Sequence, residues 1–351
     1  MIQRTRAGLF SDLTRERLKK FRRIRRAYYS LLVLGTAFIL SLFSEFIAND
    51  KPLLLFYQSK VYFPIVKFYP GSEFGGPYGT ESDYLKLNSE ASFLANGGKM
   101  IFPIIPYGPL RANLDMEGTP PHAPSQQHWL GTDNTARDVF VRLIYGFRIC
   151  MLFGLSLALS DAILGIIIGG IQGFLGGKVD ILAQRCIEIW SALPFLYVVI
   201  LLGSIYGRGF GMMLFVVSLF EWIGLSYYMR GEFLRLKGLN YVKAARALGL
   251  GPMRIFFSQI LPNAMTPVIT ILPFTVVSGI GALTALDFLG FGLPPPMPSW
   301  GELLTQGLQN LQAPWIAIST VTALFFTLLL ATFIGEGVRE AFDPKAFSRL
   351  E

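Results

Sequence analysis

The sequence predicts an all-α protein that crosses a membrane several times and carries one long insertion near its N-terminus. Charged residues make up only 15% of the 351 residues, against about 25% in a typical soluble domain. The mean hydropathy is +0.48, and several apolar runs approach the roughly 20 residues that a helix needs to cross a bilayer. A single soluble core could not bury this much apolar surface, so we expect a polytopic membrane protein.

The apolar runs are the expected membrane spans. Small residues, glycine above all, recur within them and would let the helices approach closely in lipid. Pro194 and Pro273 are expected to kink their helices. The predicted spans are Ala27–Ala48, Ile149–Gly170, Glu188–Tyr206, Gly211–Met229, Ala264–Leu286 and Pro314–Gly335.

The basic residues indicate how these spans are oriented. Residues 1–27, 173–186, 230–262 and the tail from Glu336 together hold 21 of the 31 Lys and Arg residues. Because basic loops are retained in the cytoplasm, we expect both termini to be cytoplasmic and residues 49–148 to be external.

The predicted organisation has four parts. The first part, residues 1–27, is basic and has apolar residues at helical spacing, such as Phe21 and Ile24. It is therefore expected to form a helix on the membrane surface. A disordered basic tail is the alternative. The parts are residues 1–27, a cytoplasmic basic amphipathic segment; 28–48, the first span; 49–130, a periplasmic insertion of short strands and turns; and 131–346, a transmembrane transport domain with a cytoplasmic loop at 230–262.

Several kinds of chemistry are not expected. The net charge of +8 follows from loops beside apolar spans, not from a nucleic-acid surface. His122 and His128 lack the spacing of metal ligands, and Cys150 and Cys186 are predicted on opposite sides of the membrane. We expect no catalytic residue and no metal or cofactor site.

A glycine-rich segment, Gly173–Asp180, has a superficial likeness to a phosphate-binding loop. Such a loop needs Ser or Thr after its lysine to hold magnesium, and Val179 follows Lys178 here. We therefore expect any ATP and magnesium used in transport to be bound by a different chain.

Three acidic residues, Asp161, Glu188 and Glu221, fall within or at the edges of the predicted spans. An ionisable residue inside a membrane is a functional hypothesis by default, because its burial is costly. Asp161 is the deepest of the three, so a proton-coupled secondary transporter that uses Asp161 is the alternative function.

The most informative stretch is LNYVKAARALGLGPMRIFFSQILP, residues 239–262. It predicts a helix of about two turns that begins at an N-cap, Asn240, and ends before a glycine in the left-handed conformation, Gly249. So short a helix is marginal alone and needs a partner surface. Its exposed stripe is expected to comprise Tyr241, Ala244, Ala245 and Leu248, flanked by Lys243 and Arg246.

The spacing within that stretch, Ala-Ala, three residues, Gly, twelve residues, Pro, resembles the cytoplasmic loop of dipeptide and oligopeptide ABC-importer permeases, the binding-protein-dependent transport inner-membrane components. Three further groups of residues resemble the same family in order and spacing. They are Gly131-Thr132-Asp133 with Arg137-Asp138-Val139, Arg142 and Tyr145-Gly146; Phe288-Leu289-Gly290-Phe291-Gly292 with Pro298-Ser299-Trp300-Gly301-Glu302; and Gly335-Glu336-Gly337-Val338-Arg339 with Phe342-Asp343-Pro344.

This resemblance implies a non-catalytic permease subunit of the type I importer fold with six spans, in the bacterial inner membrane. The implied partners are a second permease subunit, a cytoplasmic ABC ATPase, a periplasmic substrate-binding protein, the lipid bilayer and a peptide substrate. It also implies that the loop couples ATP hydrolysis to transport through Asn240, Tyr241, Lys243, Ala244, Ala245, Arg246, Leu248, Gly249, Leu261 and Pro262.

The insertion refines the resemblance. Ala48-Asn49-Asp50-Lys51-Pro52-Leu53, Tyr62-Phe63-Pro64 and Phe74-Gly75-Gly76-Pro77 are similar to the insertion of Yej-type permeases, which implies an importer of peptides and of the peptide–nucleotide compound microcin C. Three positions depart from the family, which often has Glu at Lys243, Gly at Ala136 and His at Gln259.

Overall fold

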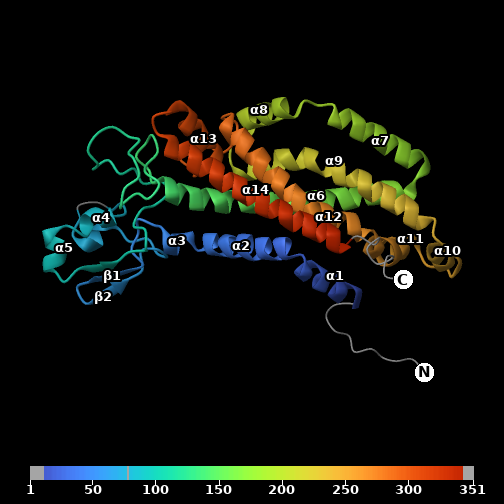
Figure 1. Cartoon of the computed structure of the whole chain (residues 1–351), viewed down its shortest axis with the longest axis horizontal. Coiled ribbons are helices and arrows are strands. Elements are labelled where there is room, and N and C mark those ends of the chain that lie inside the picture. The colour runs from blue at the N-terminus through green and yellow to red at the C-terminus, as the bar shows by residue number, and fades with distance from the viewer. Residues whose placement is uncertain (1–11, 77–78, 343–351) are drawn as a thin grey trace, which may run out of the picture. The chain divides into compact units, whose positions relative to one another are not determined.

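The computed structural model describes residues 12–76 and 79–342, and its mostly helical chain divides into two compact units (Figure 1). The first unit comprises the described parts of residues 1–35, 151–285 and 325–351, and the second comprises residues 36–150 and 286–324. The helices α2, α6 and α14 each begin in one unit and end in the other. Residues 1–11 of the predicted basic segment and residues 343–346 of the predicted transport domain lie outside the described residues.

The first unit is made of helices alone. Most of its turns fall at glycine or proline positions, and the break between α1 and α2 falls at Ile24. Its elements are α1 (Asp12–Arg23), the start of α2 (Arg25–Leu42), most of α6 (Val139–Leu175), α7 (Gly177–Ser191), α8 (Phe195–Tyr206), α9 (Phe210–Lys237), α10 (Asn240–Ala247), α11 (Pro252–Arg254), the π-helical segment η2 (Ile255–Ile260), most of α12 (Leu261–Phe288) and the end of α14 (Pro314–Phe342).

Four helical segments of the described chain are long and apolar enough to cross a membrane: Val139–Leu175, Phe210–Lys237, Pro252–Phe288 and Pro314–Phe342. They contain four of the predicted spans. A fifth predicted span, Glu188–Tyr206, covers the end of α7 and all of α8, which are bent by 74° at the break before Phe195 and form one span only if the bent pair is taken together.

Pro194 causes that break. It occupies the position before the first residue of α8 with an extended ψ of 105°, and its ring prevents the preceding turn from continuing as a helix. The remaining predicted span, Ala27–Ala48, forms α2 and the short α3 (Ser44–Ile47) with a turn at Phe43. It is not among the candidate spans, so the predicted count of six is not confirmed.

The helices α6 and α9 pack backbone to backbone through glycines of α6. A Cβ atom added at Gly169 would lie 2.2 Å from the Ser226 carbonyl oxygen, and one added at Gly173 would lie 2.5 Å from that of Arg230. Small residues let helices in lipid approach this closely, and their packing replaces a hydrophobic driving force that lipid does not supply.

The second unit contains the insertion and the loop between α12 and α14. The hairpin of β1 and β2 turns at Gln58 and Ser59, both at positive φ. Its sheet has the antiparallel order β2-β1-β3, and an aromatic cluster of Tyr57, Phe74, Tyr84 and Phe93 packs around Leu55. The elements are β1 (Leu54–Tyr57), β2 (Lys60–Tyr62), η1 (Gly71–Phe74), α4 (Tyr84–Leu87), α5 (Ala91–Ala95), β3 (Lys99–Ile101), the start of α6, α13 (Trp300–Gln309) and the start of α14.

We predict that Gly169→Ala destabilises the protein, because the new methyl group must push α9 away from α6 at a cost of about 1–3 kcal/mol. Gly231→Ala in α9 is the matched control, since a Cβ atom there meets nothing within 4 Å. The measurement is the thermal unfolding temperature of the protein purified in detergent. A fall for Gly231→Ala as large as that for Gly169→Ala would contradict this account of the α6–α9 contact.

Candidate functional site

The short helix α10 follows α9 after a tight connection. Its N-cap is Leu239, with extended backbone (φ −74°, ψ 152°) and no side-chain capping bond. The prediction that Asn240 caps this helix is therefore wrong. Because α9 runs on to Lys237 and Gly238 keeps helical dihedral angles, Leu239 is the residue that turns the chain, and Asn240 is already the first residue of α10.

The C-terminal end of α10 matches its prediction. Gly249 has φ +81°, and two hydrogen bonds close the helix: Gly249 N–H donates to the Arg246 carbonyl at 3.0 Å, and Leu250 N–H donates to the Ala245 carbonyl at 3.1 Å. This pair of bonds is a Schellman motif, which requires a left-handed residue and therefore favours glycine.

One side of α10 is anchored to the first unit. Val242 is fully buried in an apolar cluster with Phe233 and Leu236 of α9 and Ile255 and Ile260 of η2. The hydroxyl group of Tyr241 also donates to the Gln259 carbonyl of η2 at 3.3 Å. These contacts hold the helix against the ends of two long helices.

The other side of α10 is open. Tyr241, Ala244 and Leu248 of the predicted stripe are exposed, and Ala245 is half-buried. Leu248, the residue after the last one of α10, is 81% exposed. Lys243 and Arg246 are exposed as well, but at about 100° per residue they lie on the face of α10 opposite the stripe and do not border it.

The segment after α10 is wound as a π-helix. Leu261 N–H donates to the carbonyl of Phe256, five residues earlier. Pro262, which follows, has no N–H to donate to the carbonyl of Ser258, and its ring disfavours regular α-helical geometry there. π-helical turns are frequent at functional sites, and here one joins α11 to α12, whose first two residues are the predicted loop residues Leu261 and Pro262.

The three acidic residues predicted inside the membrane have different surroundings. Asp161 is buried and accepts a hydrogen bond from Thr275 at 2.8 Å, which joins α6 to α12. Glu188 is exposed and pairs with Arg185 at 2.6 Å. Glu221 is half-buried in α9, and the described residues show no hydrogen bond between any two of the three.

Sequence reasoning missed the ionic links of the first unit. Asp180 at the start of α7 forms a two-pronged pair with Arg230 of α9, with N–O distances of 2.5 and 2.8 Å. Lys237, the last residue of α9, donates to the Gly173 carbonyl near the end of α6 at 2.8 Å. The sequence contained a signal for these links, because charged residues are rare in such apolar helices and need partners there.

The second unit holds a buried charge cluster built from the motif residues of the resemblance. Arg137 donates to Asp133 at 2.8 Å and to Glu302 of α13 at 2.9 Å. The fully buried Arg142 pairs with Glu302 and lies 3.5 Å from Asp133. Two carboxylates thus neutralise two guanidinium groups and fix α13 to the start of α6.

Two further contacts hold α13 in place. Trp300, its first residue, is buried and donates its indole N–H to the Leu143 carbonyl at 3.0 Å. A Cβ atom at Gly146 would lie 2.6 Å from the Trp300 ring. At its N-terminus, the Ser299 hydroxyl donates to the Asp287 carboxylate at 2.5 Å.

Ala136 explains one departure from the family. Its φ is +60° and it is 1% exposed. The left-handed conformation favours glycine and disfavours residues with a Cβ atom. The turn between Asp133 and Arg137 therefore accounts for the glycine that the family often has at this position.

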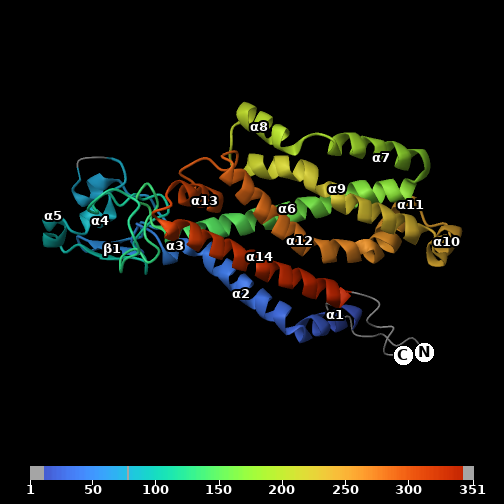
Figure 2. The same ribbon diagram turned by 45° about the horizontal axis from the view of Figure 1, so that its top comes forward.

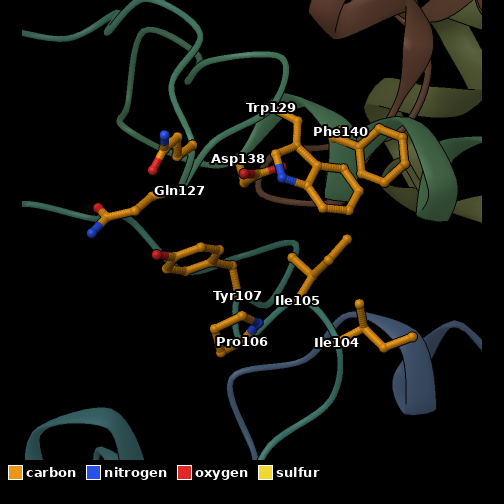
Figure 3. Close-up of a pocket in the computed structure, with 9 residues that line it drawn as sticks. Ile104, Ile105, Pro106, Tyr107, Gln127, Trp129, Asp138 and Phe140 are labelled. Atoms are coloured by element: carbon orange, nitrogen blue, oxygen red, sulfur yellow. The ribbon is translucent and has the colours of Figure 1, made fainter.

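A pocket of about 260 Å³ lies in the second unit (Figure 3). The rings of Trp129 and Phe140 form one wall, with centroids 5.3 Å apart, and Tyr107 lies opposite. The Asp138 carboxylate is already engaged, because it pairs with His128 at 2.7 Å and accepts from Val141 N–H at 2.8 Å. The volume is below the range of about 300–1,000 Å³ for small-molecule sites.

We predict that Glu302→Gln lowers the stability of the protein by about 3–5 kcal/mol, because it leaves the buried Arg142 without its main counter-charge. The control is Glu336→Gln, since Glu336 pairs with Arg26 at 3.3 Å through side chains that are 44% and 56% exposed. Such exposed pairs contribute about 0–1 kcal/mol. The measurement is the thermal unfolding temperature of each variant in detergent. Equal decreases for Glu302→Gln and Glu336→Gln would show that the charge cluster does not hold the second unit together.

Comparison with known proteins agrees with these features. Residues 163–348 match the family described as binding-protein-dependent transport system inner membrane component. The chain is 46% identical to the inner membrane ABC transporter permease protein YejE of Escherichia coli (strain K12), over 95% of this chain and 98% of that protein.

Two further relatives point to the same family. The peptidoglycan transport system permease protein YejE of Agrobacterium fabrum is 42% identical over 96% of this chain and 94% of its own length. The dipeptide transport system permease protein DppC of Bacillus subtilis is 37% identical over 68% of this chain and 75% of its own length. The chain therefore belongs to the binding-protein-dependent inner-membrane components, which are the non-catalytic permease subunits of ABC transporters.

Proposed function

We propose that this chain is one of two permease subunits of an importer that moves peptides or peptide-like compounds across the bacterial inner membrane. The family supports this assignment, and the relatives are named for dipeptide and peptidoglycan transport. A peptide is the chemistry common to those names, and microcin C, a peptide–nucleotide compound, stays a prediction within that class. Family membership favours ATP-driven import over the alternative, proton-coupled transport through Asp161.

The partners follow from the same proposal. A periplasmic binding protein delivers the substrate, and one or more cytoplasmic ABC ATPase chains bind the ATP and magnesium. The present chain binds neither of these two, since Val179 follows Lys178 in its glycine-rich turn where a phosphate-binding loop has Ser or Thr. This chain forms half of the transport pathway and changes its conformation when the ATPase closes.

The observation that carries the proposal is the two-sided character of α10. Val242 is buried on one side of this helix, and Tyr241, Ala244 and Leu248 are exposed on the other. A smooth stripe of two small residues between two larger ones can enter a narrow cleft. We infer that this stripe docks into a cleft of the ATPase.

The contacts of the first unit connect α10 to the long helices, so they support a path by which a displacement of α10 reaches those helices. Val242 ties α10 to α9 and to η2, which continues into α12. From α9, Arg230 holds α7 and Lys237 holds the end of α6. When the ATPase closes and displaces α10, we expect these four long helices to follow as one body and to change the side on which the pathway opens.

We predict that Gly249→Ala and Ala245→Glu abolish the stimulation of ATPase activity by substrate and binding protein. Alanine at φ +81° costs roughly 1–2 kcal/mol and loosens the Schellman motif. Glutamate at Ala245 places a charge against the cleft without an assured partner. The measurement is ATP hydrolysis by the reconstituted complex, with subunit stoichiometry determined in parallel.

Gly251→Ala is the matched control for that experiment. Gly251 lies two residues from Gly249 but has φ −65°, which any residue adopts, and a Cβ atom there meets nothing within 4 Å. We expect normal stimulation in this variant. Normal stimulation and uptake in Gly249→Ala and Ala245→Glu as well would show that the loop is a connector and does not couple hydrolysis to transport.

The proposed orientation places the insertion outside and α10 inside. We predict that, in a Cys150→Ser, Cys186→Ser background, a cysteine at Ser72 reacts with a membrane-impermeant maleimide on intact spheroplasts. A cysteine at Ser258 should react only after the membrane is permeabilised. Both positions are exposed in the structure, so burial would not explain a difference, and the opposite labelling pattern would invert the orientation.

A further inference from the structure

The helix α1 is fastened to the C-terminal end of α14 along one side. Figures 1 and 2 both show the two helices side by side. Phe21 of α1 is buried against Ala341, and a Cβ atom at Gly337 would lie 3.1 Å from the Phe21 ring. Ala27, near the start of α2, is buried in the same cluster. The Lys20 ammonium group also donates to the Glu340 carbonyl at 2.6 Å.

The opposite side of α1 carries basic residues that do not take part in this packing. Arg15, Lys19, Arg22 and Arg23 are exposed, and no hydrogen bond or ion pair joins them to another residue within the described chain. At about 100° per residue they fall within an arc of roughly 100°. The side formed by Arg17, Phe21 and Ile24, which faces α14, lies on the far side of the helix.

The basic arc lies next to residues suited to lipid. Only Ile24 separates α1 from α2, the first predicted span, and Arg25 adds a further exposed cation at the start of α2. Tyr29, Leu32 and Val33 of α2 are exposed apolar residues. At a rise of about 1.5 Å per residue, the cations lie near the depth of lipid headgroups when these residues face the acyl chains.

From this juxtaposition we propose that the exposed arc of α1, formed by Arg15, Lys19, Arg22 and Arg23, binds the phosphate groups of anionic phospholipids in the cytoplasmic leaflet. Basic residues beside a membrane segment attract anionic lipid, and the effect is roughly fivefold in affinity for each residue near the surface. Because α1 also packs against α14, lipid bound on the arc stabilises the contact between α1 and the C-terminal end of α14. The inference depends on the orientation proposed above, which puts α1 in the cytoplasm.

The test is the thermal unfolding of the full chain, purified with its partner subunits in detergent, during titration with phosphatidylglycerol. We expect stabilisation by phosphatidylglycerol, little by phosphatidylcholine, and a weaker effect in 0.5 M salt because exposed charges are screened. At least tenfold more phosphatidylglycerol should be needed for half of the maximal rise in unfolding temperature in the fourfold variant Arg15→Gln, Lys19→Gln, Arg22→Gln, Arg23→Gln. The double variant Arg15→Gln, Arg22→Gln should fall between it and the wild type.

The matched control removes the same charge elsewhere. Lys60, Lys67, Lys86 and Lys99 are exposed in the insertion, and their joint replacement by glutamine should leave the response unchanged. A wild-type response in the fourfold α1 variant would overturn the proposal. Loss of the ATPase subunit from that variant with an unchanged lipid response would also overturn it, because the arc would then bind a protein.

The labelling of Ser72 and Ser258 keeps this proposal separate from the proposed function. If the orientation is as proposed and the α1 variant keeps its lipid response, only the lipid inference fails. If the orientation is inverted, the labelling experiment reports it without reference to lipid.

Discussion

An eight-residue helix has too few internal hydrogen bonds to persist in water, so the proposed coupling role of α10 depends on the burial of Val242. That side chain fixes the helix against α9 and η2, and the Schellman motif at Gly249 fixes its end. Because the anchor occupies one side only, the small and smooth stripe on the other side stays open to a partner. The same contact that makes the helix stable therefore makes it able to transmit a displacement.

Charged residues fix other helices of the protein in place, as the buried Val242 fixes α10. In apolar helices an unpaired charge is costly, and several of the polar contacts link different elements. Arg230 and Asp180 join α9 to α7, and Asp161 joins α6 to α12 through Thr275. In the second unit, Glu302 joins α13 to the start of α6 through Arg137 and Arg142.

The sequence allowed prediction of features whose cause is local. The apolar lengths of α6, α9, α12 and α14 and the positive φ of Gly249 follow from composition and from residue type. The break at Pro194 was expected only as a kink, because the angle depends on what packs around it. The N-cap was placed one residue late, at Asn240, since side-chain preference for capping does not show where α9 ends. The pairing of Arg142 with Glu302 joins residues 160 positions apart, and no local pattern indicates such a partner.

The central claim is that α10 and the helices that carry it move as one body when the ATPase closes. The most direct test is the distance between spin labels on Ala247, which lies outside the docking stripe, and Arg235 of α9, measured by pulsed electron paramagnetic resonance in the assembled complex. Both positions are exposed. The account predicts one narrow distance distribution that is the same without nucleotide and with trapped ATP. A distribution that shifts or splits when ATP binds would show that α10 moves independently of α9 and would contradict it.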